Sequence, residues 1–289
     1  PGKCLVENRL NTKIRRLLAA AFTPRQLARI DTHIVANAKR IVDDIADKGE
    51  VDFVTEVAAL VPMHNICAMV GIPEEHRRTV AYESQFADGW RDERLLQGAE
   101  PLARVFQTIT TVRAIADELV AERRREPQDD LLTSLVQAEV DGERLTDDEI
   151  SSFFMLLIIA GNDTTRQSTS HGMKALTDFP DQRAWLMEDL ATRMPSAVEE
   201  IVRWATPIMT FRRTAAHDTE LCGQRITKGD KVVMFYSSAN WDTKVFDHPE
   251  RLNLSRSPNK HISFGGGGIH HCLGAQLARR QLSATFREL

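Results

Sequence analysis

Apolar residues recur at helical spacing over the first two-thirds of the chain. The first such stripe follows Thr23 and Pro24, a pair with the form of a helix N-cap and a first-turn proline, and Gly49 ends it. Its members are Leu27, Ile30, Ile34, Val35, Ala38, Ile41, Val42 and Ile45. This segment is predicted to be an amphipathic helix.

A second stripe of the same period covers residues 102–120 and ends in the charged residues 122–126, with Pro127 as a helix breaker. Its members are Leu102, Val105, Phe106, Ile109, Val112, Ala116, Leu119 and Val120. A helix is predicted here too. The three arginines that follow are expected to form a solvated helix end.

The longest predicted helix begins at a capping box. Thr146 is its N-cap, and Glu149 stands three residues later, where it can bond back to the Thr146 amide. The helix is expected to run to about Leu176. Its middle, residues 153–160, is apolar all round, which is typical of a helix at the centre of a fold. A further helix is predicted for residues 195–204.

The pattern changes after Pro207. Residues 228–230, Lys-Gly-Asp, are typical of a turn, and residues 231–236 are typical of a strand. Residues 242–260 are rich in Pro, Asn, Asp and Ser and predict an irregular loop, and helical spacing returns after Leu273. The predicted fold class is therefore mainly α with a small β portion, in a single domain over residues 1–289.

Composition narrows the class of protein. The chain has 289 residues, of which 42% are hydrophobic, and its net charge is −4. That charge and the lack of a long basic block argue against a nucleic-acid partner. The longest apolar run is too short to cross a bilayer, and no secretory signal is visible. Four widely spaced cysteines suit a reducing compartment. A soluble, cytoplasmic protein without a membrane anchor is expected.

Residues 264–274, Phe-Gly-Gly-Gly-Gly-Ile-His-His-Cys-Leu-Gly, place four glycines ahead of Cys272 and a predicted helix. Glycines let a backbone approach a flat or charged group, and a helix N-terminus stabilises a thiolate. A phosphate loop would need Lys-Ser/Thr after the glycines. Zinc would need a second cluster of ligands beside His270, His271 and Cys272. A single axial thiolate is predicted, against the alternative of a buried inert cysteine.

At this loop the chain resembles the cytochrome P-450 family of haem-thiolate monooxygenases. The residues that match its cysteine-loop signature are Phe264, Gly265, Gly267, Gly268, His270, Cys272 and Gly274. The resemblance implies the cytochrome P-450 fold and a haem b cofactor, iron protoporphyrin IX. It also implies that Cys272 is the axial ligand of the haem iron.

Two further motifs extend the resemblance. Glu200 and Arg203 match the family's helical Glu-x-x-Arg pair, although such a spacing is also common on helix surfaces. The segment His-Pro-Glu-Arg, which ends at Arg251, matches the partner of that pair. The resemblance implies that Glu200, Arg203 and Arg251 are structural residues that fix the cysteine loop.

The third motif is Ala-Gly-Asn-Asp-Thr-Thr, residues 160–165, inside the longest helix. These residues lower helix propensity and invite bonds from side chain to backbone, so a tolerated kink is the simplest alternative. The resemblance instead implies a groove for dioxygen in this helix, with Ala160 and Gly161 as cofactor-binding residues. It also implies that Asp163 and Thr164 form a catalytic proton relay.

The positions expected at the haem propionates follow from the resemblance alone. Arg15, Arg213 and His270 match residues that bind the haem propionates. Leu156, Ala160, Ile208 and Met209 are expected to form an apolar wall of the substrate pocket. The chain is expected to be truncated at both ends, without an N-terminal β-rich portion and a final hairpin. Asn11 and His271 depart from the family's usual residues.

The resemblance is strongest to an actinobacterial subgroup that hydroxylates steroid side chains and methyl-branched lipids. It implies a sterol or long branched-chain substrate, oxidised with dioxygen at or near a chain terminus. Electrons are expected to come from NAD(P)H through a ferredoxin reductase and a ferredoxin. The alternatives are a peroxide-driven haem peroxygenase and a non-catalytic haem-binding protein.

Overall fold

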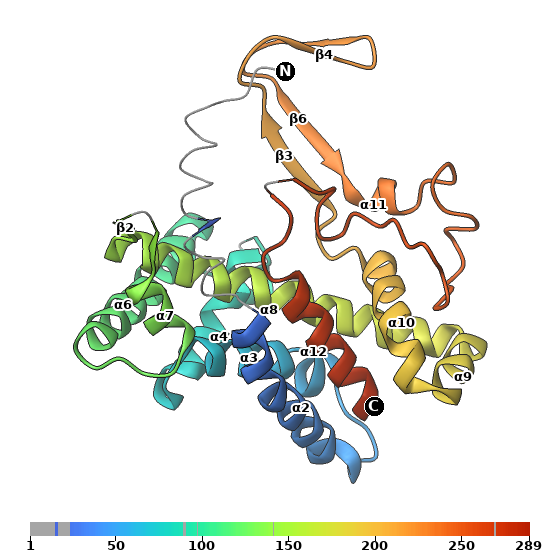
Figure 1. Ribbon diagram of the computed structural model, residues 1–289, viewed down its shortest axis with the longest axis horizontal. Coiled ribbons are helices and arrows are strands. Elements are labelled where there is room, and N and C mark those ends of the chain that lie inside the picture. Colours follow the sequence, from blue (N-terminus) through green and yellow to red (C-terminus); the bar gives the residue numbers. More distant parts are fainter. Residues whose placement is uncertain (1–14, 17–23, 89–90, 97, 141, 269) are drawn as a thin grey trace. The chain divides into compact units, whose positions relative to one another are not determined.

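The computed structural model describes residues 15–16, 24–88, 91–96, 98–140, 142–268 and 270–289 (Figure 1). Their contacts group into two compact units, which are described separately. The first holds the described residues of 13–170 together with 273–289, and the second holds His171–Cys272. The single domain over residues 1–289 stays a prediction.

The first unit consists mainly of helices. They are α2 (Pro24–Ala46), α3 (Leu60–Val70), α4 (Glu74–Asp88), α5 (Glu93–Leu96), α6 (Pro101–Arg125), α7 (Leu131–Gln137), most of α8 (Asp147–Asp178) and α12 (Ala275–Glu288), with a π-helical turn, η1, at Val54–Ala58. The strands β1 (Glu139–Val140) and β2 (Glu143–Arg144) pair as an antiparallel hairpin. Helices α2, α6 and α12 confirm the predicted helical segments.

Helix α8 begins at the predicted capping box. The Glu149 N–H donates to Thr146 Oγ1 at 3.2 Å, and the Thr146 N–H donates to Glu149 Oε2 at 2.8 Å. Both bonds satisfy amides that a helix start leaves without partners. The helix ends at Asp178, two residues beyond the predicted Leu176. The other predicted N-cap, Thr23, lies outside the described residues.

The core of the first unit lies where α8 passes between its neighbours. Fully buried side chains of α2, α3, α6 and α8 belong to one cluster, among them Ile34, Ile66, Ala116, Leu119 and Phe154. Helix α12 lies beside α2 (Figure 1), and Arg280 forms an ion pair with Asp31 there. The core cluster includes Phe154 and Ile158 of α8 together with side chains of α3 and α6, so α8 is buried on the side that carries these two residues.

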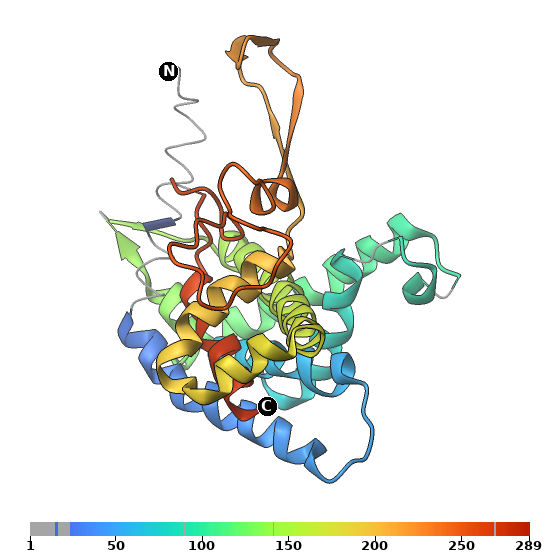
Figure 2. The ribbon, with the colours of Figure 1, turned by 90° about the vertical axis from the view of Figure 1, so that its right-hand side faces the viewer.

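The second unit combines helices with a long β ribbon. Its elements after α8 are α9 (Pro180–Glu188), α10 (Leu190–Ala205), β3 (Thr210–Thr214), β4 (Thr219–Leu221), β5 (Gln224–Ile226), β6 (Lys231–Phe235) and α11 (Tyr236–Asn240). Strands β3 and β6 are antiparallel, with Thr210 opposite Phe235. Figure 2 shows β4 and β5 at the far end of this ribbon.

Two boundaries in the second unit differ from prediction. Helix α10 begins at Leu190, before Pro195, because the Asp189 side chain accepts the Thr192 N–H and caps it. Strand β6 ends at Phe235, and Tyr236 already starts α11. Residues 242–260 are all described and form an irregular loop, as predicted.

Candidate active site

Helix α10 carries a buried ion pair. Glu200 and Arg203 stand three residues apart, and both side chains are 0% exposed. Arg203 Nε donates to Glu200 Oε2, and Arg203 Nη2 donates to Glu200 Oε1, both at 2.8 Å. This is the bidentate arrangement, which is the strong form of the Arg–carboxylate contact. Buried charges are costly to desolvate, so their remaining hydrogen-bonding capacity has to be met by neighbours.

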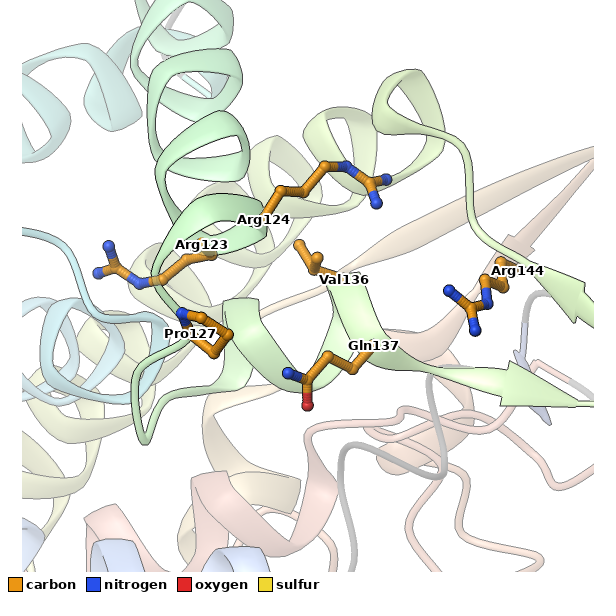
Figure 3. Close-up of a pocket in the computed structure, with 6 residues that line it drawn as sticks. All are labelled: Arg123, Arg124, Pro127, Val136, Gln137 and Arg144. Carbon is orange, nitrogen blue, oxygen red and sulfur yellow. The ribbon is translucent and has the colours of Figure 1, made fainter.

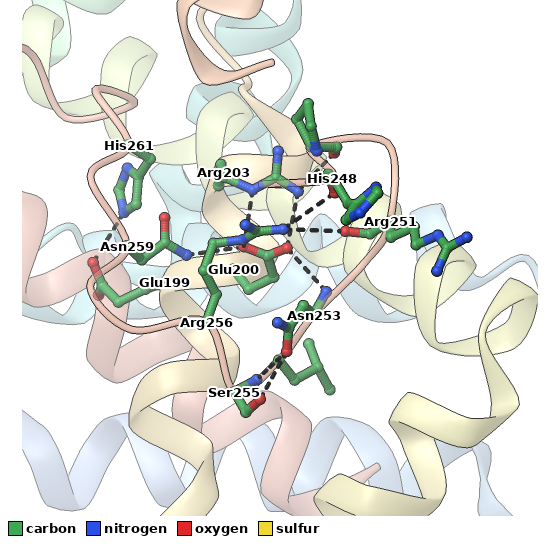
Figure 4. Close-up of polar contacts among 12 residues, drawn as sticks. Glu199, Glu200, Arg203, His248, Arg251, Asn253, Ser255, Arg256, Asn259 and His261 are labelled. Atoms are coloured by element: carbon green, nitrogen blue, oxygen red, sulfur yellow. Dashed lines mark hydrogen bonds and ion pairs between the residues drawn. The ribbon is translucent and has the colours of Figure 1, made fainter. Parts of the chain in front are cut away.

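The loop after α11 supplies the remaining hydrogen-bond donors to the Glu200 carboxylate (Figure 4). The Asn253 N–H donates to Glu200 Oε1 at 3.0 Å. Asn259 Nδ2 and Arg256 Nε donate to Oε2 at 2.9 and 3.1 Å. Glu200 therefore accepts hydrogen bonds from three residues of one irregular loop.

The guanidinium of Arg203 donates hydrogen bonds to two backbone carbonyls of the same unit. Its Nη1 donates to the Asn240 carbonyl at 2.9 Å, and its Nη2 donates to the Pro249 carbonyl at 3.1 Å. A loop without helix or strand needs such anchors because its carbonyl and amide groups lack regular partners. The pair is thus the structural centre of residues 240–259, and the expected role of Glu200 and Arg203 in fixing the cysteine loop stays a prediction.

The expectation for Arg251 is wrong. Its side chain is exposed, and Arg256, whose side chain is only 9% exposed, contacts Glu200 instead. The reason lies in a turn at the surface, where the Arg251 N–H donates to the His248 carbonyl at 3.0 Å. Figure 4 shows the Arg251 guanidinium pointing away from the cluster. Arg256 also donates to the Asp247 carbonyl at 2.8 Å, so it anchors the turn as well as the acid.

Cys272 lies at the end of a loop that returns to its own start. The Cys272 N–H donates to the Phe264 carbonyl at 2.8 Å, and the Gly265 N–H donates to the Ile262 carbonyl at 2.7 Å. The His271 N–H donates to the Gly268 carbonyl at 3.2 Å. The Cys272 side chain is exposed, so the alternative of a buried inert cysteine is excluded.

Three of the four loop glycines are required by the backbone. Gly265, Gly267 and Gly268 have φ values of 95°, 91° and 78°, in the left-handed region that side chains disfavour. A Cβ at Gly266, Gly267 or Gly268 would meet nothing within 4 Å, so crowding is not the cause. The result is a bare backbone surface next to an exposed thiol. This surface and its sulfur donor fit a flat cofactor such as haem.

On α8, the predicted proton relay is engaged with its own helix. The Asp163 carboxylate pairs with Arg166 and accepts a hydrogen bond from Gln167 Nε2 at 2.6 Å. Thr164 Oγ1 donates to the Ala160 carbonyl at 2.8 Å. Such a bond to the preceding turn is the usual one for a threonine inside a helix.

Leu156, Ala160 and Thr164 recur every four residues and therefore share one face of α8. Leu156 is 57% exposed and Ala160 is also exposed, whereas Phe154 and Ile158 on other faces are buried. An uncovered apolar stripe on an otherwise buried helix is unusual. It fits a surface against which an apolar group lies.

The remaining predicted site residues fall in both units. Arg15, Leu156, Ala160, Gly161, Asp163 and Thr164 belong to the first, and Ile208, Met209, Arg213, Phe264, Gly265, His270 and Cys272 to the second. Met209 is 65% exposed, and Ile208 is half-buried. The Arg213 side chain is exposed and donates to the Arg212 carbonyl. That both sets surround one haem stays a prediction.

A cavity of about 380 Å³ lies elsewhere in the first unit (Figure 3). Its lining residues are Arg123, Arg124, Pro127, Val136, Gln137 and Arg144. Each guanidinium has a carboxylate partner: Arg123 pairs with Asp130, Arg124 with Asp147 and Arg144 with Glu139. Because these charges are balanced, we assign no ligand to the cavity.

The expectation of a solvated helix end is wrong for Arg123. Its side chain is 2% exposed, and Nη2 donates to the Gly71 carbonyl at 2.8 Å. It therefore joins the end of α6 to the end of α3. The end of α3 leaves backbone carbonyls without helical partners, and Arg123 is buried because it donates to the one at Gly71.

The family model for cytochrome P-450 matches residues 95–289. This range includes the Asp163-Thr164 pair, the Glu200-Arg203 pair and the Cys272 loop. The chain belongs to the cytochrome P-450 family. The predicted resemblance is thereby confirmed.

Curated relatives fall in the predicted subgroup. A methyl-branched lipid omega-hydroxylase of Mycobacterium tuberculosis is 42% identical over 280 residues, which cover 96% of this chain and 65% of the relative. A steroid C26-monooxygenase of Rhodococcus jostii is 40% identical over 279 residues, covering 96% and 57%. The chain thus spans about 65% of the length of the first of these cytochrome P-450 relatives.

A solved structure confirms the fold. A Mycobacterium marinum cytochrome P-450 in complex with pseudoionone superposes with a TM-score of 0.91 at 58% identity, covering 96% of this chain and 67% of the other. The helix-rich architecture with small sheets is therefore that of cytochrome P-450. Across the described residues, each helix is too short or too polar to cross a membrane.

Several residues of the site do not follow from the sequence pattern. Arg256, Asn259 and Asn240 complete the Glu200-Arg203 cluster, and His261 contacts Glu199. Their signal was present in the polar residues that recur through 253–261. These residues predict only an irregular loop, because a loop has no period from which facing residues could be inferred.

Proposed function

We propose that the full-length protein is a haem-dependent monooxygenase that uses dioxygen to hydroxylate a hydrophobic substrate. The observation that carries this proposal is the exposed Cys272 thiol at the end of a glycine backbone loop, in a chain of the cytochrome P-450 family. Haem b, when bound, supplies the oxidising chemistry, and thiolate ligation favours cleavage of the O–O bond. Cys272 would hold the iron, and Arg15, Arg213 and His270 would bind the propionates.

The polar residues of α8 have the complementary task of supplying protons. Asp163 exchanges protons at its carboxylate oxygens, and Thr164 donates from Oγ1 on the face that it shares with Leu156 and Ala160. For this, Thr164 has to release the Ala160 carbonyl, which is a rotation about one side-chain bond. The apolar neighbours on that face keep water away from the reacting carbon.

The names of the relatives support a substrate class. We propose a steroid side chain or a methyl-branched lipid, supported by the names of both relatives and by the apolar exposed side chains of Leu156 and Met209. Electrons are proposed to come from NAD(P)H through a ferredoxin reductase and a ferredoxin. We propose the cytoplasm as the location.

The test begins with the full-length protein, reconstituted with haem, reduced and exposed to carbon monoxide. A strongly red-shifted Soret band is expected for the wild type and for Cys222→Ser, a control at a cysteine that is also exposed. Cys272→Ser should show the ordinary band. A red-shifted band that survives Cys272→Ser would refute the ligand assignment.

Turnover separates the remaining candidates. The holoprotein is supplied with ferredoxin, its reductase and NAD(P)H under isotopically labelled dioxygen, with a sterol or a methyl-branched fatty acid as substrate. Label in a hydroxylated product is expected. Product formed only with added peroxide would identify a peroxygenase, and binding without product under either condition would identify a non-catalytic haem protein.

A further inference from the structure

His261 begins the segment that leads into the cysteine loop, and its ring is held at both nitrogens. The side chain is 4% exposed. Nε2 lies 2.9 Å from Glu199 Oε2 on α10, and Nδ1 accepts the Ser263 N–H at 3.3 Å. Because an accepting Nδ1 carries no proton, the ring proton is assigned to Nε2, which donates it to Glu199. The imidazole therefore joins α10 to the loop backbone.

The next two residues are held by α10 and α11. The Ile262 N–H donates to Asn240 Oδ1 at 2.8 Å. Ser263 Oγ donates to the Val202 carbonyl at 2.9 Å and accepts from Asn240 Nδ2 at 2.8 Å. With His261, three consecutive residues are fixed by side-chain hydrogen bonds. Asn240 is itself 0% exposed, so its two bonds are shielded from competing water.

The anchored segment ends at the carbonyl that holds Cys272. The Phe264 carbonyl accepts the Cys272 N–H at 2.8 Å, and the Phe264 ring lies 5.8 Å from the His261 ring, centroid to centroid. The Gly265 N–H returns to the Ile262 carbonyl at 2.7 Å. A shift of residues 261–263 therefore moves both the carbonyl under Cys272 and the turn that precedes it.

We propose that His261 is a positioning residue for Cys272, which bridges the Glu199 carboxylate and the Ser263 amide and so fixes the Phe264 carbonyl. This role rests on the proposed function, because its consequence is a stable bond between Cys272 Sγ and the haem iron. Asn240 still holds Ile262 and Ser263 when His261 is lost. Residues 262 and 263 then keep their hydrogen bonds to Asn240 but lose those of His261. The loss therefore changes where the Phe264 carbonyl lies and leaves the loop folded.

Four variants of the full-length holoprotein divide the bridge into its parts. His261→Ala removes both bonds. His261→Asn keeps an acceptor near the place of Nδ1 but is too short to reach Glu199, and Glu199→Gln keeps an acceptor oxygen for Nε2. The matched control is His248→Asn, at an exposed histidine of the preceding loop with φ of 46°, a conformation that asparagine tolerates.

Two readouts are taken on each variant. One is the rate at which the red-shifted carbon monoxide band of the reduced protein decays to the ordinary band. The other is hydrogen exchange of the backbone amides of residues 262–272. Both rates are expected to rise about tenfold in His261→Ala, since the lost bond goes to a charged group. They should rise less in His261→Asn and in Glu199→Gln, which keeps a neutral acceptor for Nε2, and stay near the wild type in His248→Asn.

Unchanged decay and exchange in His261→Ala would overturn the positioning role, and so would equal changes in His248→Asn. If His261→Ala does not fold, His261→Asn decides by the same criteria. A wild type without the red-shifted band would instead refute the proposed function. In that case the exchange of residues 262–272 still tests whether His261 holds the loop.

Discussion

Gly161 on α8 lies directly against Ile66 on α3. A Cβ added to Gly161 would come within 2.5 Å of Ile66 Cδ1, closer than real Cβ contacts allow. Ile66 is 2% exposed and packed in the core, so it has little room to move away. Close approach of the two helices at this point therefore depends on glycine.

Gly161→Ala is expected to destabilise the protein. Overpacking of a core contact costs about 1–3 kcal/mol, and the better helix propensity of alanine returns up to about 1 kcal/mol of that. Ile66→Val removes Cδ1 and alone costs about 0.5–1.5 kcal/mol. The double variant should be more stable than the sum of the single effects predicts. Urea unfolding of all four proteins measures this, and strict additivity would exclude the contact as the cause.

The buried pair on α10 gives a second prediction. Glu200→Gln removes the negative charge opposite Arg203 and leaves a buried, unpaired guanidinium, so a loss of about 3–5 kcal/mol of unfolding free energy is expected. Arg203→Lys keeps the positive charge but should also lower the unfolding free energy, because an ammonium group cannot form the bidentate contact. Denaturant unfolding measures both, with the exposed Glu250→Gln as control. A loss no larger than the control's would contradict a structural role for the pair.

The two arginines of the following loop are predicted to differ. Arg256→Ala removes a buried donor from Glu200 and from the Asp247 carbonyl and should cost about 1.5–3 kcal/mol. Arg251→Ala changes an exposed side chain and should stay within about 0.5 kcal/mol of the wild type. The thermal unfolding midpoints of the two variants, compared in parallel, decide between them. Similar losses in both would restore Arg251 to the cluster.

Much of this architecture could be predicted because helices have a period. The stripes from Leu27 to Ile45 and from Leu102 to Val120, and the capping box at Thr146, located α2, α6 and α8. The cysteine loop could also be predicted, since four glycines ahead of a cysteine fit neither a phosphate loop nor a zinc site. The identity of these motifs also led to the family that the comparisons confirm.

What the sequence did not show lies mostly in the loop of residues 242–260. The choice between Arg251 and Arg256 depends on a turn closed by one backbone hydrogen bond, and no periodic pattern encodes it. The burial of Arg123 was missed for a similar reason. Its partners, Asp130 and the Gly71 carbonyl, come from other elements that only the tertiary structure brings to it.

Thr164 offers a prediction that depends on the proposed function. Thr164→Ala removes the Oγ1 proton and should lower the hydroxylated product formed per NAD(P)H oxidised by about tenfold or more, with peroxide released instead. Thr164→Ser keeps the hydroxyl and should retain most of the coupling. Thr177→Ala, which removes a similar hydroxyl from the exposed end of the same helix, is the control. Full coupling in Thr164→Ala would remove Thr164 from the proton relay.

His64 on α3 is the group for which a pH effect is expected. It is half-buried, and its Nδ1 lies 3.0 Å from Arg40 Nη2, which donates to it. Burial lowers the pKa of His64 below its ordinary value of 6.5, and the positive charges of Arg40 and Arg77 lower it further, against a smaller opposing effect of Glu74. The folded protein therefore favours the neutral ring.

This lowered pKa predicts a loss of stability on acidification. Above about pH 6.5 the ring is neutral in both states, so its contribution is fully present. As the pH falls below that value, the unfolded chain takes up the proton first, and stability declines until the folded pKa is reached. His64→Asn keeps an acceptor for Arg40 but does not titrate. Its unfolding midpoint should therefore fall less between about pH 7.5 and about pH 5.5 than that of the wild type, and an equal fall would show that His64 is not responsible.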